Sequence, residues 1–238
     1  FKKGRLTLWL ATQAPESAKL AAAKAIGIDA DNVTLIQMMA GGSFGRNLDN
    51  RIAEQAAILA QHAGRPVQVI WSRPEDFIRD IVRPPAHARM TAALGRGGVI
   101  EGLAVRIAVP AMARQQIRRL KGDTPVEALR AVTGDHDPLA IDGAVPPYSI
   151  PNLSVDHFPV DLPLPTGLWR GNAHGYTAFF VESFINELAA AAGIEPLSFR
   201  MQMLVGQTRL ARCLTNVAAL AGWDGGAENS GKGLACHS

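Results

Sequence analysis

The sequence predicts an α+β fold in which helices pack on mixed sheets. A hairpin is predicted where residues 86–94 and 99–109 flank the turn Gly95-Arg96-Gly97-Gly98. Residues 146–165 are extended and rich in proline, which blocks ladder donors and therefore favours edge strands or loops. The strand–helix–strand opening also suits a doubly wound α/β fold, but the hairpin and the extended stretch favour α+β.

The opening of the chain predicts a strand, a helix and a second strand. Alternating leucines from Leu6 to Leu10 are typical of a strand. Pro15 suits the first turn of a helix that runs to about residue 26, and Gly27 suits its C-terminal stop. Residues 32–39 are predicted as a second, largely buried strand.

A second helix is predicted from residue 48 to residue 63, ended by Gly64. Its expected buried face holds apolar residues at helical spacing, namely Leu48, Ile52, Ala56, Leu59 and Ala63. Residues 67–71 are predicted as a third strand. The following Ser72-Arg73-Pro74-Glu75 matches a capping box with proline in the first turn.

The chain divides into a first half (1–110), a variable connection with one or two short helices (111–145) and a second half (146–238). The second half holds an apolar helix over residues 176–192, and a further helix begins near Pro196. Both ends suggest a piece of a longer polypeptide.

Composition narrows the function classes. The net charge is +3 and the basic residues are scattered, which argues against a nucleic-acid partner. One basic run (Arg114, Arg118, Arg119, Lys121) is predicted as a solvated helix face, with a docking patch for an acidic subunit as the alternative. Two cysteines are too few for a disulfide framework, the histidines lack metal-ligand spacing, and no apolar run reaches membrane-spanning length.

Two glycine-rich loops precede predicted helices. The first is Gly41-Gly42-Ser43-Phe44-Gly45-Arg46 and the second spans residues 167–175, which include Trp169, Arg170 and Gly171. Such loops let the backbone approach an anion and offer it unpaired N–H groups. Gln13 lies at a third junction, between the first strand and its helix. The alternatives are that Phe44 fills the core, that Gln13 is an ordinary helix-entry residue and that Arg170 forms a structural salt bridge.

These motifs, in this order, resemble the molybdenum-hydroxylase family of xanthine oxidase and aldehyde oxidoreductase. The matching pieces are Thr12-Gln13, the loop 41–46, Tyr148-Ser149-Ile150-Pro151-Asn152 and Trp169-Arg170-Gly171. The second loop and the helix after it look most like the isoquinoline 1-oxidoreductase beta-subunit branch. A generic nucleotide-binding module is a weaker alternative, because neither GxGxxG nor GxxxxGK[ST] is present.

The resemblance implies one molybdopterin-binding region over residues 1–238 that holds a molybdopterin cofactor with molybdenum, often in its cytosine dinucleotide form. It implies hydroxylation of an aldehyde or an aromatic N-heterocycle with oxygen from water, and electron transfer to a 2Fe–2S small subunit. By position, Gln13 matches the glutamine that hydrogen-bonds the molybdenum oxo group, and a neutral amide can donate there without adding charge. The two loops match the cofactor-binding loops, with Phe44 beside the metal.

Departures from the family pattern restrict the chemistry. Leu48 stands where xanthine-type enzymes carry a substrate glutamate, and residues 139–145 lack their substrate arginine, so purines are not expected. Gly171 replaces the cysteine of carbon-monoxide dehydrogenases. The family's catalytic glutamate lies far downstream, so we expect no catalytic residue in this chain and an inactive isolated piece. A non-catalytic cofactor-binding or assembly module is the alternative, and the bacterial compartment, cytoplasmic or periplasmic, stays open.

Two further residues of the second half have open roles. His174 is either a donor behind the cofactor site or a structural histidine. Glu182 is expected to be a buried partner for an arginine such as Arg170.

Overall fold

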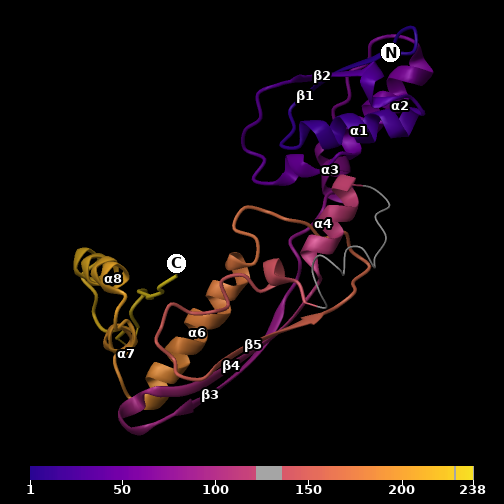
Figure 1. The fold of residues 1–238 in the computed structure, drawn as a ribbon. Helices are drawn as coiled ribbons and strands as arrows, with labels where there is room; N and C mark the ends of the chain where they lie inside the picture. Colours follow the sequence, from indigo (N-terminus) through magenta and orange to yellow (C-terminus); the bar gives the residue numbers. More distant parts are fainter. Residues whose placement is uncertain (122–135, 228, 238) are drawn as a thin grey trace. The chain divides into compact units, whose positions relative to one another are not determined.

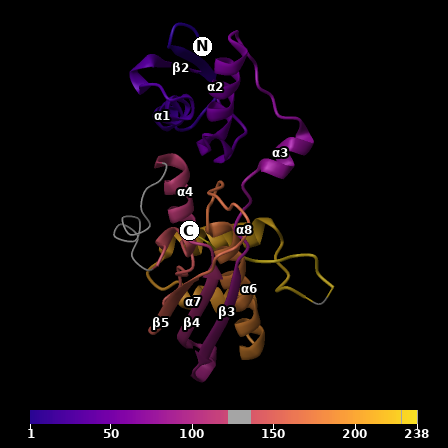
Figure 2. The ribbon, with the colours of Figure 1, turned by 90° about the vertical axis from the view of Figure 1, so that its right-hand side faces the viewer.

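The structure is a computed structural model that describes residues 1–121, 136–227 and 229–237. Contacts divide the chain into two compact units (Figures 1 and 2). The first unit joins Phe1–Pro84, Pro110–Asp137 and Asp161–Arg170. The second joins Pro85–Val109, Pro138–Val160 and Gly171–Ser238. Each unit mixes helices with strands, which confirms the α+β prediction.

The first unit is built on a parallel pair of strands, β1 (Leu6–Leu10) and β2 (Val33–Gln37). Helix α1 (Pro15–Ile26) connects them, as predicted, together with the short helix η1 (Ala30–Asn32), which was not predicted. Strand β2 is not largely buried as expected, because only Val33 of its five residues is buried. The unit continues with η2 (Arg46–Leu48), α2 (Arg51–Ala63), α3 (Arg73–Arg79) and α4 (Met112–Lys121).

Helix α2 buries a different face from the one predicted. Leu59 is 49% exposed and Ala63 is also exposed, whereas Ala53, Ala57 and Ala60 are buried. The reason lies in α1, which packs against α2 and turns its own alanines toward it. Small side chains let two helix axes approach closely, so this contact selects the alanine stripe rather than the larger apolar residues.

The predicted third strand at residues 67–71 is wrong. The described backbone from residue 65 to residue 72 contains no strand, and Ile70 is 78% exposed. This segment is instead attached by a side chain, because Trp71 Nε1 donates to Gln55 Oε1 on α2 at 2.8 Å. The start of α3 agrees with the prediction, since Ser72 Oγ accepts from the backbone N–H of Glu75.

The second unit contains a three-stranded sheet in the order β3-β4-β5. Strands β3 (His87–Leu94) and β4 (Ile100–Val109) form the predicted hairpin around η3 (Arg96–Gly98). Strand β5 (Leu153–Pro159) pairs parallel to β4 at the sheet's edge, which confirms the edge position expected of the proline-rich stretch. Alternate β4 residues are buried, including Leu103, Val105 and Ile107.

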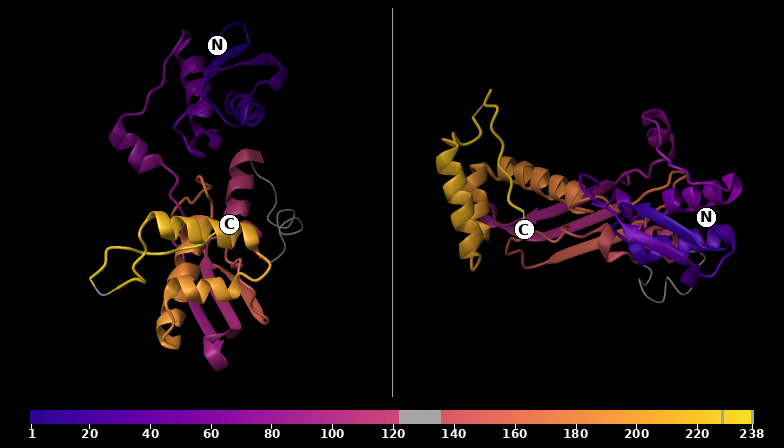
Figure 3. Two further views of the ribbon diagram at one scale, coloured as in Figure 1. Left: turned by 90° about the vertical axis from the view of Figure 1, so that its left-hand side faces the viewer. Right: turned by 90° about the horizontal axis from the view of Figure 1, so that it is seen from above.

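Helix α6 (His174–Ala192) runs along this sheet (Figure 1). It is followed by α7 (Pro196–Met203), which was predicted, and by α8 (Thr208–Leu220), which was not. The short helix η4 (Pro138–Ala140) precedes β5. After α8 the chain turns back as a C-terminal segment, residues 231–237, drawn in yellow (Figure 3). No single described helix is long and apolar enough to cross a membrane. Among the described helices, only α6 and α7 taken together have the length and composition of a membrane span, and they meet at a 106° bend.

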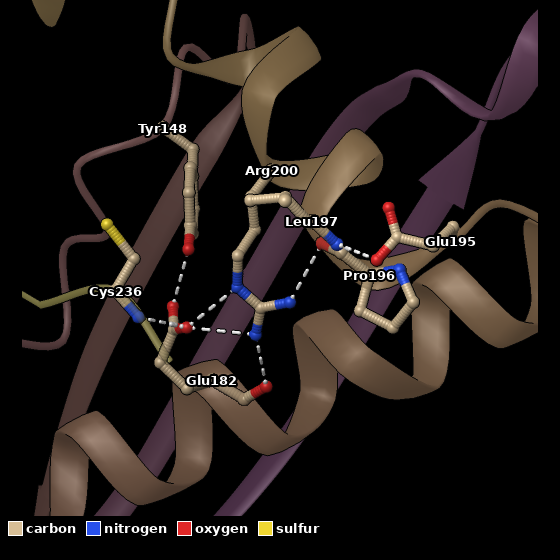
Figure 4. A network of polar contacts seen from close by, with 7 residues as sticks. All are labelled: Tyr148, Glu182, Glu195, Pro196, Leu197, Arg200 and Cys236. Atoms are coloured by element: carbon tan, nitrogen blue, oxygen red, sulfur yellow. Dashed lines mark hydrogen bonds and ion pairs between the residues drawn. The ribbon is translucent and has the colours of Figure 1, made fainter. Parts of the chain in front are cut away.

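A buried polar network ties α6 to α7 (Figure 4). Glu182 on α6 accepts from Arg200 Nε at 3.0 Å and from Arg200 Nη2 at 2.9 Å. It also accepts from the Tyr148 hydroxyl at 2.8 Å and from the backbone N–H of Cys236 at 2.7 Å. The expected pairing of Glu182 with Arg170 is therefore wrong. Arg200 follows one helix later and is fully buried, so the carboxylate has its cation within the same unit.

Part of the predicted connection at residues 111–145 lies outside the described residues, namely residues 122–135 and the side chains of Arg118 and Lys121. One of the predicted short helices is α4. Arg119 on α4 is not part of a fully solvated face, because it is half-buried, donates to Gln116 Oε1 at 3.2 Å, and burial lowers its pKa.

Candidate functional site

The first glycine loop bends sharply between β2 and η2. Gly42 (φ 69°), Phe44 (φ 49°) and Gly45 (φ 107°) all have left-handed backbone conformations. Such a conformation costs energy for a bulky residue such as phenylalanine, so the surrounding loop must hold it. The Phe44 side chain is 55% exposed, which excludes the alternative that it fills the core.

The second loop meets the first at this bend. The backbone N–H of Arg170 donates to the carbonyl of Phe44 at 2.7 Å, and the Arg170 guanidinium lies 5.6 Å from the centre of the Phe44 ring. A Cβ atom on Gly45 would come within 2.8 Å of the backbone oxygen of Leu168. Glycine is therefore required at position 45 for the two loops to approach each other.

Gln13 joins the same assembly from the end of β1. Its backbone N–H donates to the carbonyl of Asn47 at 2.9 Å, and its side-chain Oε1 accepts from Ser43 Oγ at 3.1 Å. Within the described residues its Nε2 has no hydrogen-bond partner, and the side chain is exposed. The amide therefore offers its donor group to solvent or to a ligand.

The arginine of the first loop is directed back toward the protein. Arg46 forms an ion pair with Asp80, and its guanidinium lies 5.5 Å from the centre of the Trp71 ring. Its backbone N–H donates to the carbonyl of Ser43 at 2.8 Å. Arg46 thus fixes the loop through its side chain and leaves the glycines as the open part.

The remaining predicted residues flank the loop contact. The buried Nε1 of Trp169 has no hydrogen-bond partner in the described part of the chain. Gly171 has φ 81° and begins the segment assigned to the second unit, whereas the other predicted cofactor residues lie in the first. The structure therefore brings Gln13, the loop 41–46 and residues 169–170 into one unit.

Sequence reasoning missed several supporting residues. Arg83 Nη2 donates to the carbonyl of Arg170 at 3.2 Å, and Asp80 holds Arg46. Asp49 is buried at the start of α2, where its Oδ1 accepts from the backbone N–H and the Nε of Arg51. Burial, with Asp49 as the second cause, raises the pKa of Glu54 on α2. No sequence motif marks these residues, because their roles depend on contacts between distant segments.

His174 lies in the second unit, at the first position of α6. Its side chain bonds Asp142 and His237, so it has a structural set of partners there. Within the described residues, no group of three or more His, Cys, Asp or Glu side chains could hold a metal ion.

Comparison with known proteins gives relatives that are named as oxidoreductases or dehydrogenases. The chain is 26% identical over 240 residues to the beta subunit of the isoquinoline 1-oxidoreductase of Brevundimonas diminuta, covering 98% of this chain and 29% of the relative. It is 26% identical over 204 residues to the large molybdopterin subunit of the nicotinate dehydrogenase of Eubacterium barkeri, covering 84% of this chain and 44% of the relative. The chain thus spans less than half of the length of these relatives.

A solved structure shows the same fold. The quinoline 2-oxidoreductase of Pseudomonas putida 86 superposes with a TM-score of 0.71 at 18% identity, covering 91% of this chain and 29% of that one. Residues 1–121, which contain Gln13 and the first loop, match the family model of the molybdopterin cofactor-binding domain. The chain therefore belongs to the molybdopterin cofactor-binding domain family of the molybdenum hydroxylases.

Proposed function

We propose that this chain is the molybdopterin-binding part of a molybdenum hydroxylase that oxidises an aldehyde or an aromatic N-heterocycle. The names of its relatives support this substrate class, since they include an isoquinoline oxidoreductase, a nicotinate dehydrogenase and an aldehyde oxidoreductase. Leu48 and Gly171 argue against purine and carbon-monoxide chemistry, as the family pattern implies. Electrons pass to a 2Fe–2S partner subunit.

The observation that carries the proposal is the contact between the two glycine loops beside Gln13. The Arg170 N–H to Phe44 carbonyl bond of 2.7 Å and the Ser43 to Gln13 bond of 3.1 Å bring three separate segments into one unit. The sequence resemblance selected the same three segments. Their convergence provides one wall for a ligand.

The residues present fit a polyanionic cofactor. A Cβ on Gly41 or Gly42 would meet nothing within 4 Å, so the backbone of the loop is open to a large ligand. The Nε2 of Gln13 is available as a neutral donor, and the Trp169 indole N–H lacks an acceptor among the described residues. When bound, the cofactor supplies a metal centre that transfers oxygen derived from water and accepts the substrate's electrons.

The resemblance implies the individual roles. Gln13 would donate to the cofactor's oxo group, and Gly41, Gly42, Ser43 and Gly45 would offer it their backbone. Phe44 would present its exposed ring to the cofactor, and Trp169, Arg170 and Gly171 of the second loop would also hold it. Arg46 keeps the loop in place through Asp80. The family pattern implies that the general base is a glutamate that this chain does not supply, so the chain alone would be inactive.

Replacement of Gln13 in the intact complex tests the proposal. Gln13→Ala removes one preorganised donor at the metal and should lower kcat about a hundredfold. Gln61→Ala is the matched control, because Gln61 Nε2 bonds the carbonyl of Ile26, outside the loops. Molybdenum content and melting temperature are measured in parallel.

Two outcomes would contradict the proposal. An unchanged rate in Gln13→Ala with equal molybdenum content would remove the assigned role of Gln13. A native complex that contains molybdopterin but turns over neither aldehydes nor N-heterocycles would favour the assembly module instead.

A further inference from the structure

Three side chains in the second unit form a hydrogen-bonded chain at the start of α6. His174 Nε2 lies 3.1 Å from Asp142 Oδ2, and His174 Nδ1 lies 2.7 Å from His237 Nε2. The two rings meet edge to face, with centroids 4.9 Å apart. His237 belongs to the C-terminal segment, so this contact joins that segment to α6.

The chemistry of the three groups fixes the protons. A carboxylate only accepts, so His174 carries its proton on Nε2 and, when neutral, presents a lone pair on Nδ1. His237 Nε2 then donates across the 2.7 Å contact. A further proton on His237 Nδ1 leaves this bond intact, but a proton on both facing nitrogens abolishes it. The contact therefore tolerates one cationic ring and not two.

The surrounding contacts hold the pair in position. A Cβ on Gly143 would collide with His174 Nδ1, so glycine makes room for the ring. Thr177 Oγ1 on α6 donates to the carbonyl of Asp142 at 2.8 Å, which fixes the carboxylate's loop to the same helix. The pairing is thus built from α6, the loop before β5 and the C-terminal segment.

The C-terminal segment has a second anchor that does not depend on histidine. The backbone N–H of Cys236 donates to Glu182, which also binds Arg200 and Tyr148. Leu234 and Cys236 are buried. Loss of the histidine contact should therefore loosen the end of the segment without unfolding the unit.

We propose that the His174–His237 contact is a proton-controlled tether, which holds residues 231–237 on α6 near neutral pH and releases them in acid. Asp142 is the charged group that faces His174, and Glu182 with Arg200 and Tyr148 faces the neighbouring Cys236. Imidazoles in general change charge between about pH 5 and pH 8, so a comparison of pH 7.5 with pH 5.0 tests the tether. The proposal does not rest on the proposed function.

The backbone of His174 is held as well. Its N–H donates to the carbonyl of Gly171 at 2.8 Å, three residues before it. The ring therefore stands on an ordered residue at the start of α6.

Peptide-resolved hydrogen exchange on the full chain tests the tether. Protection of residues 231–237, corrected for intrinsic exchange, should fall about two- to tenfold between pH 7.5 and pH 5.0, as expected for one hydrogen bond. His237→Gln should show the low protection at both pH values. His62→Gln is the control, because His62 bonds the carbonyl of Ile58 in the first unit.

A second variant separates proton control from simple packing. Asp142→Asn keeps an acceptor for His174 Nε2 but removes the negative charge that favours a second proton, so the loss of protection should shift to lower pH. A purely structural contact would show no such shift.

Selective ¹⁵N-histidine labelling observes the bond directly. A scalar coupling across His174 Nδ1 and His237 Nε2 should be present at pH 7.5 and absent at pH 5.0, which decides the matter even if a variant folds poorly. Equal protection of the wild-type segment at both pH values would overturn the proposal. The proposal would also be overturned if, at constant pH, the protection of this segment rose on addition of Zn²⁺ and fell on addition of EDTA, because a metal ion would then join the two rings.

Discussion

Glu182→Gln should strongly destabilise the second unit. The carboxylate accepts four hydrogen bonds, two from Arg200 and one each from Tyr148 and the backbone of Cys236. Arg200 is 0% exposed, so the neutral amide would leave its charge buried without a counterion. Breaking such a pair from one side costs about 3–5 kcal/mol.

The double variant Glu182→Gln/Arg200→Met determines where that energy comes from. Removing the guanidinium eliminates the uncompensated charge. Tyr148 and Cys236 bond different oxygens of Glu182, so the amide of the variant can still accept from the Cys236 N–H through its oxygen and donate to the Tyr148 hydroxyl through its NH₂. We therefore expect the double variant to recover at least half of the stability lost in the single variant. Direct burial of the charge, rather than lost packing, is then the main cost.

Urea unfolding monitored by hydrogen exchange in α6 and α7 peptides measures this unit separately from the first. A shift of the midpoint at constant slope reports stability alone. A loss below about 1 kcal/mol in Glu182→Gln, or a double variant less stable than the single one, would refute the electrostatic reasoning.

Three further predictions concern the loops, the α1–α2 contact and the cap of α7. Gly45→Ala should lower the cofactor content of the native complex, since the residue has φ 107° and a Cβ would lie 2.8 Å from Leu168 O. Gly102→Ala on β4 is the control and should retain the cofactor, because its Cβ would make only ordinary contacts with Asn152, at 3.7 and 3.8 Å. Metal analysis of both variants measures the difference, and equal loss would contradict the loop geometry. Ala57→Leu should lower the free energy of unfolding by about 1–3 kcal/mol because it overpacks the α1–α2 contact, whereas Leu59→Ala at an exposed position should change it by less than about 0.5 kcal/mol. Thermal unfolding compares the two variants, and a larger loss in Leu59→Ala would show that α2 buries the face with Leu59 instead. Burial alone would raise the pKa of Glu195, but hydrogen bonds from Leu197, Trp223 and Ser198 lower it to about 2. The stability that this carboxylate gives α7 as its N-cap is therefore fully present above about pH 4.5 and is lost as the pH falls toward 2. Hydrogen exchange of the α7 amides should increase between pH 5 and pH 2.5 in the wild type, and an equal increase in Glu195→Ala would argue against this role of Glu195.

Much of the local structure could be predicted because it depends on local chemistry. The alternating leucines of β1, the proline at the start of α1 and the glycines at residues 27, 64 and 193 define their elements through short-range sterics. The hairpin of β3 and β4 follows from its glycine turn in the same way. Helix α8 was missed, although its apolar residues are spaced to bury Leu214 and Ala218.

Predictions failed where a distant segment made the choice. The buried face of α2 is set by the alanines of α1, and the residues before α3 are held by a tryptophan side chain rather than by a strand ladder. Glu182 was correctly expected to be buried beside an arginine, but the identity of that arginine depended on how α6 and α7 fold together.

The sequence alone determined which segments are predicted to form the cofactor site, because the glycine loops and Gln13 match the family pattern in residue type and order. Only the tertiary structure decided how they meet. It placed Arg170 against the Phe44 carbonyl, turned Arg46 toward Asp80 and joined His174 to His237. These contacts join residues that are far apart in the chain, and no local pattern encodes them, since their energy depends on distances that exist only after the chain has folded.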